Sequence, residues 1–263
     1  MCATCGCSDD AGVRVLEPGQ GHGHGHGHGP GEHVHPPEPV TRTVLFEQDV
    51  LAKNDSLAER NRIWLSGRGI VAVNLMSSPG SGKTTLLERT VRELGDEVPV
   101  AVVEGDQETL LDAERVHATG TPVVQINTGA GCHLDAEMLA RGLEVLDPVD
   151  GSVLFIENVG NLVCPALFDL GESARVVIMS VTEGPGKPLK YPHMFAATDL
   201  VLLNKIDLLP YVDFDVDEFT RDARSVNPGV RVLPVCATRG DGLAPWYAWL
   251  REVRGRTSAP VTP

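Results

Sequence analysis

Residues 71–94 read VAVNLMSSPGSGKTTLLERTVREL, and this stretch limits the possible folds more than any other part of the chain. An apolar run of strand length leads into a glycine-rich turn, and the residues after the turn have the apolar spacing of a helix. Such a unit points backbone N–H groups and a helix N-terminus at one place, where phosphate oxygens bind. The stretch therefore predicts an α/β unit that holds a phosphorylated ligand.

Short apolar runs alternate with helical stretches along the rest of the chain. This alternation is typical of a parallel sheet buried between two layers of helices. We therefore expect an α/β protein, with a three-layer domain and a mostly parallel sheet over residues 69–255. The pattern predicts buried strands at 71–76, 98–106, 122–127, 152–158, 174–181, 199–205 and 230–237, and helices at 84–94, 107–119 and 134–146.

The two ends of the chain differ from this domain. Residues 1–40 contain almost no large apolar side chains and are rich in Gly, His and Pro, which predicts a disordered Cys- and His-rich metal-binding tail. Residues 256–263 are expected to form a disordered C-terminal tail. Residues 41–68 predict a helical N-terminal extension that packs on the domain through Leu45, Val50, Leu51, Leu57, Ile63 and Trp64.

The charge of the chain excludes several classes of partner. Its 263 residues include 22 Lys and Arg against 36 Asp and Glu, a formal net charge of −14, which repels nucleic acid and anionic lipid and attracts cations. No apolar run approaches the roughly 18 residues of a membrane span, and the first residues lack the pattern of a secretory signal. We therefore expect a cytoplasmic protein with no nucleic-acid or membrane partner, whose six cysteines are thiols able to bind metal.

The glycine-rich turn carries most of the residues of a phosphate-binding loop. Lys83 is expected to reach the β and γ phosphates, and the Thr84 hydroxyl to bind Mg²⁺. The general pattern G-x-x-x-x-G-K-[ST] has Gly where this chain has Ser77. The alternative is a turn that only joins a strand to a helix. The expected loop residues are Gly80, Ser81, Gly82, Lys83, Thr84 and Thr85.

The stretch NKID at 204–207 indicates which base is bound. It follows an apolar run, where the Asp207 carboxylate can accept both N–H donors of the guanine Watson–Crick edge, with Asn204 and Lys205 beside it. In CAT at 236–238, Ala237 is expected to place a backbone N–H near the guanine oxygen. These residues predict GTP and GDP as ligands, the alternative being a surface sequence that matches by chance.

Two acidic residues end predicted strands at the edge where ligands bind in open α/β sheets. Asp106 is expected to hold Mg²⁺ directly or through water. Glu157 begins the sequence ENVG, which ends at Gly160, and this stretch is interpreted as the sensor of the γ-phosphate. Lys83, Asp106 and Glu157 are the predicted catalytic residues. The alternative for either carboxylate is an ordinary polar strand end.

The N-terminal tail offers two groups of soft or borderline metal ligands. Cys2, Cys5 and Cys7 lie within one short loop, and removal of Met1 would free the Cys2 amine as a fourth, nickel-suited ligand. The alternative is three cysteines grouped by chance. The alternating His22, His24, His26 and His28 predict a high-capacity metal store of low selectivity. The alternative for these histidines is an expression tag.

A third group of metal ligands comes from the predicted domain. Cys132 and His133 precede a predicted helix, and Cys164 follows the γ-phosphate sensor in the sequence. Three ligands do not close a tetrahedral site, so water or a second subunit would complete it. A segment that moves when the γ-phosphate leaves would displace Cys164, which predicts that nucleotide and metal affect each other's binding. The alternative is a buried cysteine and a histidine without a metal role.

The combination of MCATCGC, the His-rich stretch, SSPGSGKTT, EGDQ, GAGCHLDAEML, ENVGNLVCPA, KPLKYP and NKID resembles the HypB family of nickel-insertion GTPases, which mature [NiFe] hydrogenase. The resemblance implies a P-loop GTPase fold and GTP-linked homodimerisation. It also implies Ni²⁺ at the N-terminal cysteines and Ni²⁺ or Zn²⁺ at Cys132, His133 and Cys164. The partners that it implies are a small zinc-containing accessory protein of the HypA type and the hydrogenase large-subunit precursor.

Three other functions remain open from the sequence. A urease-accessory nickel GTPase has similar nucleotide motifs, but its Cys-Pro-His metal site differs from Cys164-Pro165-Ala166 here. A nickel storage or buffering protein would use the tail as its active part. An ATP-dependent kinase would prefer ATP over GTP.

Overall fold

The computed structural model describes residues 42–107, 109–129 and 131–257. The predicted tail of residues 1–40 lies outside these ranges, and so do residues 258–263 of the predicted C-terminal tail. The last described helix reaches Thr257, two residues into that predicted tail.

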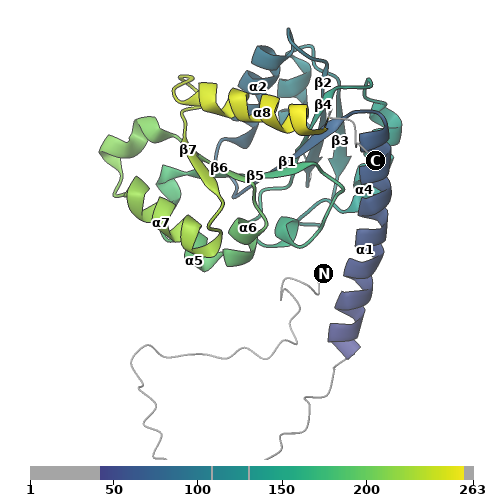
Figure 1. Ribbon diagram of the computed structural model, residues 1–263, viewed down its shortest axis with the longest axis horizontal. Helices are drawn as coiled ribbons and strands as arrows, with labels where there is room; N and C mark the ends of the chain where they lie inside the picture. The colour runs from purple at the N-terminus through teal and green to yellow at the C-terminus, as the bar shows by residue number, and fades with distance from the viewer. Residues whose placement is uncertain (1–41, 108, 130, 258–263) are drawn as a thin grey trace, which may run out of the picture.

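A parallel sheet forms the centre of the described chain (Figure 1). Its strand order is β3-β2-β4-β1-β5-β6-β7, and every neighbouring pair is parallel. The phosphate-loop strand β1 therefore lies between β4 and β5, so the turn after it opens at the carboxyl edge of the sheet. Each predicted strand is confirmed: β1 Val71–Ser77, β2 Val100–Asp106, β3 Val123–Asn127, β4 Val153–Glu157, β5 Ala174–Ser180, β6 Leu200–Asn204 and β7 Arg231–Pro234.

Helices cover both faces of this sheet, which confirms the three-layer α/β architecture. Three helices pack on one face through a single core cluster: α2 Lys83–Leu94, α3 Leu111–His117 and α8 Leu243–Thr257. The other face is covered by α1 Arg42–Gly67 and α4 Ala136–Leu146 over one part of the sheet. The short helices α5 Lys187–Lys190 and α6 Pro192–Ala196 lie with α7 Val216–Val226 over the rest of that face.

The N-terminal extension is one helix, but its buried face only partly matches the predicted one. Of the predicted contacts, Leu51 and Leu57 are half-buried, whereas Val50, Ile63 and Trp64 are exposed. Ala58 and Leu65 are buried instead. Two buried asparagines hold the helix because their amides donate to backbone carbonyls: Asn54 to Asp169, and Asn61 to Ala136 and Leu170. The contact combines amide hydrogen bonds with the buried side chains of Ala58 and Leu65, so an apolar stripe alone does not indicate it.

The two edge strands, β3 and β7, also differ from the prediction of buried strands. In β3, four residues are half-buried and Asn127 is exposed. Arg231 and Pro234 are exposed in β7, and the two residues between them are half-buried. This strand lies at the edge of the sheet with only β6 beside it, and edge strands remain partly in water.

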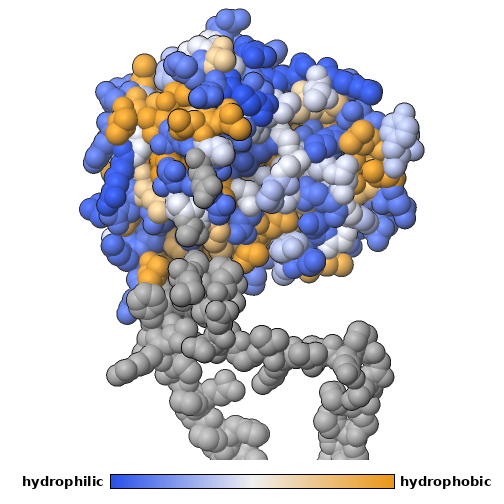
Figure 2. All heavy atoms as spheres, turned by 180° about the vertical axis from the view of Figure 1, so that it is seen from behind, coloured by the Kyte–Doolittle hydropathy of each residue, from blue (hydrophilic) through white to orange (hydrophobic). Residues whose placement is uncertain are grey.

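No helix in the described ranges is both long and apolar enough to span a bilayer. Seen from behind (Figure 2), hydrophobic side chains at the surface lie in several patches separated by polar residues.

Candidate functional site

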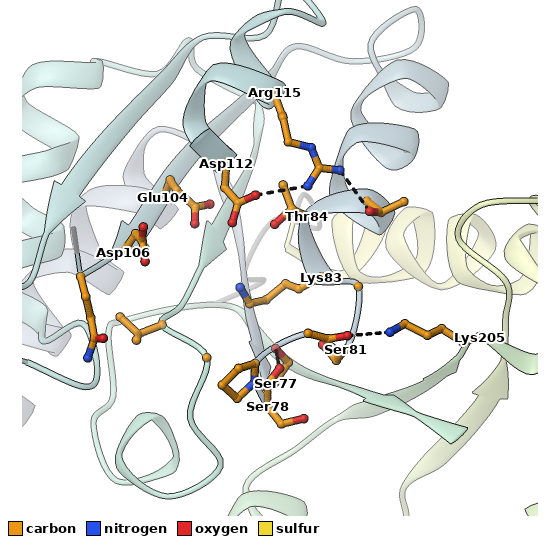
Figure 3. A pocket seen from close by; sticks show the side chains of 18 residues that line it. Ser77, Ser78, Ser81, Lys83, Thr84, Glu104, Asp106, Asp112, Arg115 and Lys205 are labelled. Atoms are coloured by element: carbon orange, nitrogen blue, oxygen red, sulfur yellow. Dashed lines mark hydrogen bonds and ion pairs between the residues drawn. The ribbon is translucent and has the colours of Figure 1, made fainter. Parts of the chain in front are cut away.

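A pocket of about 540 Å³ opens at the carboxyl edge of the sheet, above β1 and β2. Figure 3 shows Lys83 in the middle of this pocket, with Glu104, Asp106 and Asp112 on one side and Lys205 on the other. All six predicted loop residues line it. The remaining lining residues that matter for the site are Gln107, Arg115, Val159 and Gly160.

Local backbone geometry explains the glycines of the loop. Gly80 and Gly82 have φ values of +75° and +94°, which side-chain-bearing residues rarely adopt. A Cβ at Gly82 would lie 2.5 Å from Nδ2 of Asn204, so the close approach excludes any side chain. Ser77 still belongs to β1, and its buried hydroxyl donates to the Ser78 carbonyl at 2.9 Å. A side chain is therefore accommodated at the position where the general motif has glycine.

The loop lysine and threonine both bind the predicted γ-phosphate sensor. Lys83 Nζ and Thr84 Oγ1 each lie 2.7 Å from the same oxygen of Glu157, which is fully buried. Burial lowers the pKa of Lys83, but the carboxylates of Glu157 and Glu104 outweigh it and raise that pKa above its usual value. Lys83 is therefore a cation held against an anion at the floor of the phosphate pocket.

Two further carboxylates, Glu104 and Asp112, complete an acidic group that the sequence analysis missed. Ligand atoms of Glu104, Asp112 and Glu157 all lie within 4.8 Å of one another. In the described part of the chain, Glu104 Oε2 and Glu157 Oε2 are buried without a hydrogen-bond partner. Burial first, and then the charge of Glu157, raise the pKa of Glu104 to about 11. The sequence signal was the charge itself, since Glu104 interrupts an otherwise apolar strand.

Asp106 ends β2 and lines the same pocket, two residues beyond Glu104 and so on the same face of the strand. It accepts hydrogen bonds from Thr109, at 3.0 Å from the backbone N–H and 2.7 Å from the hydroxyl. Burial raises the pKa of Asp106, but these bonds and the Gln107 N–H outweigh it, so the pKa is lowered. Asp106 is an ionised carboxylate at the pocket wall, as an Mg²⁺ ligand requires.

The NKID stretch is attached directly to the phosphate loop. Asn204 donates to the Ser81 carbonyl at 2.9 Å, and Lys205 Nζ donates to the Gly80 carbonyl at 2.7 Å. The Ala237 N–H donates to Asn204 Oδ1 at 3.0 Å, so this donor is engaged within the protein. The contact between the Ala237 N–H and the guanine oxygen stays a prediction, and the bond to Asn204 does not support it because the N–H is already used.

Asp207 lies next to Cys236, the first residue of the CAT stretch. The Cys236 thiol donates to Asp207 Oδ1 at 3.1 Å, and Arg239 lies 3.9 Å from Oδ2 of the same carboxylate. Cys236 is buried, whereas the Asp207 side chain is 19% exposed. The Asp207 carboxylate thus remains accessible at the border of the site, where it could accept hydrogen bonds from the Watson–Crick edge of guanine.

The three predicted domain metal ligands meet in space. Sγ of Cys132 lies 2.9 Å from Sγ of Cys164 and 3.7 Å from Nδ1 of His133. Cys164 is fully buried, and His133 stacks on Phe168 with ring centroids 3.9 Å apart. Burial lowers the pKa of His133, although Asp135 partly offsets it, so the imidazole is neutral over a wider pH range. Two thiols and a neutral imidazole suit nickel or zinc.

The N-terminal candidates cannot be placed in this way. Cys2, Cys5, Cys7, His22, His24, His26 and His28 all lie outside the described residues.

The fold and the site define the class of this protein: a P-loop nucleotide-binding protein with a Cys–His cluster near its phosphate pocket. A sequence model of the nucleotide-binding domain of CobW, HypB and UreG matches residues 71–234. The chain is 57% identical over 215 residues to hydrogenase maturation factor HypB of Azotobacter chroococcum mcd 1, which is 82% of this chain and 70% of that protein. The chain belongs to the HypB family of hydrogenase maturation factors.

Solved structures agree with this assignment. Hydrogenase maturation factor HypB from Archaeoglobus fulgidus superposes with a TM-score of 0.72 at 43% identity, over 77% of this chain and 99% of that one. HypB from Helicobacter pylori, solved in complex with nickel, gives 0.73 at 35% identity, over 80% of this chain and 99% of that one.

Proposed function

We propose that this chain is a GTP-hydrolysing nickel metallochaperone, which delivers Ni²⁺ during [NiFe] hydrogenase maturation. One observation carries the proposal. The segment that begins at Glu157, bonded to both Lys83 and Thr84, continues to Cys164, which lies against Cys132. A single stretch of chain thus touches both the phosphate pocket and the Cys–His cluster.

Residues in and beside the pocket have distinct roles in the proposed GTP hydrolysis. Lys83 and the loop Gly80–Thr85 bind the phosphates, and Asp207, backed by Asn204 and Lys205, selects guanine. Phosphate oxygens compete with Glu157 for Lys83, which frees Glu157 to position the attacking water. Rate enhancement then comes from positioning and charge stabilisation rather than covalent chemistry.

The acidic wall of the pocket fits a hard cation. In the described chain, buried carboxyl oxygens of Glu104 and Glu157 have no hydrogen-bond partner, which leaves room for a cation beside ionised Asp106. Thr84 and Asp106 would hold Mg²⁺, and Glu104 would have to lose its proton to join them. The ion would neutralise the phosphate charge that develops during transfer.

Nickel is the cargo, and the Cys–His cluster is its proposed site beside the nucleotide, with Zn²⁺ as a competing ion. The nickel complex of the Helicobacter pylori relative supports this assignment. Three protein ligands leave a position for water or for a second subunit, which fits a GTP-linked homodimer. The N-terminal cysteines would bind nickel tightly, and the His-rich stretch would store it.

The proposed partners follow from the family. A HypA-type zinc accessory protein would exchange nickel with this chain, and the hydrogenase large-subunit precursor would receive it. We propose that exchange and transfer take place in the cytoplasm.

Lys83→Ala tests the GTPase assignment. We expect GTP turnover to fall by about a hundredfold or more, because a preorganised charge at the phosphates is lost. Lys53→Ala is the control, since Lys53 pairs with Glu137 on the exposed surface, outside the pocket lining. Turnover at the parent rate in Lys83→Ala would contradict the assignment.

Nickel titration of the GDP-bound and GTP-analogue-bound forms tests the delivery role, with Cys164→Ala as the comparison. We expect different nickel affinities in the two parent forms, and weak, equal binding at this cluster in the variant. Equal affinities in both parent forms would contradict nucleotide-controlled delivery.

A further inference from the structure

Asn158 follows Glu157 directly and is fully buried. Its side-chain oxygen accepts two backbone N–H groups: that of Val159 at 3.0 Å and that of Leu134 at 3.1 Å. Val159 lines the phosphate pocket, and Leu134 directly follows Cys132 and His133. One amide oxygen therefore joins the backbone of the phosphate-sensing segment to the backbone of the metal-ligand segment.

The other side of Leu134 touches the strand that carries the acidic residues. A Cβ at Gly105, between Glu104 and Asp106, would lie 2.7 Å from Cγ of Leu134. The absent side chain at Gly105 thus makes room for the fully buried Leu134. Leu134 is fixed from two sides, by the end of β2 and by Asn158.

The Asn158 amide group is held as firmly as its oxygen. Its Nδ2 donates to Asn74 of β1 at 3.3 Å, and Asn74 in turn donates to Glu172 at 3.1 Å. All three side chains are buried. Because buried polar groups require partners, this network restricts the Asn158 side chain to one orientation relative to the backbone around it.

We infer that Asn158 is the positioning residue that couples the phosphate pocket to the nickel cluster, through its bond to the Leu134 N–H. When nucleotide draws Lys83 and Thr84 away from Glu157, the backbone at Asn158 shifts and carries Leu134, and with it Cys132 and His133. The inference rests on the proposed function and names the contact through which the two sites communicate. By linkage, the same contact transmits the effect of nickel on nucleotide binding.

The experiment measures the ratio of nickel dissociation constants in the GDP-bound and GTP-analogue-bound forms, with Mg²⁺ present. It uses the full chain with Cys2, Cys5 and Cys7 changed to alanine, so that thiolate-to-nickel absorption reports the Cys132 and Cys164 site. In this background we expect a ratio of about fivefold or more, the lower range of allosteric coupling. In Asn158→Ala we expect a ratio within about twofold of 1. We expect the same loss in the reciprocal measurement, which is the ratio of nucleotide dissociation constants with and without nickel.

One variant separates coupling from structural damage. Asn54→Ala removes another buried amide oxygen that anchors the same segment, since Asn54 Oδ1 accepts the Ala136 N–H at 2.9 Å from helix α1. Asn54 lies outside the phosphate segment, so we expect its loss to leave the ratio unchanged.

Two outcomes would overturn the inference: a full ratio in Asn158→Ala, or an equal loss in Asn54→Ala. If Asn158→Ala does not fold, Gly105→Ala replaces it, because its Cβ displaces Leu134 and is expected to lower the ratio; an unchanged ratio there also overturns the inference. A ratio of 1 in the background itself contradicts both the inference and the proposed nucleotide control. If the background keeps its ratio, the results for the variants bear only on the Asn158–Leu134 contact and leave the proposed nucleotide control standing.

Discussion

Glu104 and Glu157 are register partners on the neighbouring parallel strands β2 and β4. Their carboxyl groups therefore extend from the same face of the sheet into a buried space beneath the phosphate loop. Lys83 bonds to Glu157 at 2.7 Å, which neutralises only one of the two acids. Glu104 retains its proton instead, and its pKa rises to about 11.

Glu104→Gln is expected to change how stability depends on pH. A raised carboxyl pKa means that the parent loses stability as pH rises from 4.5, the unperturbed value, towards about 11, because the unfolded chain ionises first. Glutamine mimics the protonated acid and does not ionise. The free energy of unfolding of the variant, measured by urea denaturation without nucleotide or metal, will therefore exceed that of the parent by more at pH 8 than at pH 6.

Glu97→Gln is the control for that comparison. A hydrogen bond from Arg251 lowers the pKa of the exposed Glu97, so this carboxylate is ionised at both pH values in the folded and unfolded chain. The difference in free energy of unfolding between Glu97→Gln and the parent will therefore stay constant between pH 6 and pH 8. A constant difference for Glu104→Gln as well would show that Glu104 is charged in the folded protein.

Gly82→Ala and Gly80→Ala form a matched pair in the phosphate loop. Both glycines have positive φ, so each alanine costs stability, about 1–2 kcal/mol. Only the Gly82 Cβ would collide with Asn204, at 2.5 Å, whereas nothing lies within 4 Å of a Cβ at Gly80. We expect Gly82→Ala to weaken GTP binding at least about tenfold more than Gly80→Ala does, as measured by calorimetry. Equal losses of GTP affinity in the two variants would mean that the contact between a Gly82 Cβ and Asn204 does not affect GTP binding.

The two groups of ligands in the tail can be separated in cells that depend on this chain for hydrogenase activity. Alanine at His22, His24, His26 and His28 is expected to lower that activity only when nickel is scarce, because a store matters only under shortage. Alanine at Cys2, Cys5 and Cys7 is expected to lower it at every nickel level below gross excess. The reverse pattern would assign delivery to the histidines and storage to the cysteines.

The sequence predicted the sheet well because its central strands are apolar runs buried on both faces, a pattern that does not depend on distant partners. It predicted the packing face of α1 only in part, because that face depends on Asn54 and Asn61 meeting carbonyls of remote loops. It also missed the helices α7 and α8, although Asp215 caps α7 by accepting the N–H groups of Asp217 and Glu218. The contacts of Asn54 and Asn61 are visible only after the chain has folded, whereas the Asp215 cap is a local signal that the sequence analysis did not use.

The site divides in a similar way. Lys83, Thr84 and Asp207 could be predicted because each belongs to a short motif whose spacing reflects its chemistry. Glu104 was missed: its charge within an apolar strand was a signal, but its role comes from the register of β2 against β4, which the sequence does not show. The meeting of Cys132 with Cys164 was predicted from residue types and from their places before a predicted helix and after the γ-phosphate sensor, and the structure confirms that they lie together.

The thiol of Cys236 gives the last prediction, because it donates to Asp207 Oδ1 at 3.1 Å and lies 3.2 Å from the Thr238 hydroxyl. Cys236→Ala removes this donor and leaves Asp207 with only the distant Arg239 among the side-chain contacts described above. The loss of one modest hydrogen bond is expected to reduce the preference for GTP over ATP by about threefold to tenfold. Cys236→Ser keeps a donor and is expected to retain the preference. The preference is the ratio of the two dissociation constants, so a general loss of stability cancels from it. Equal preferences in both variants and the parent would show that Asp207 needs no support from Cys236.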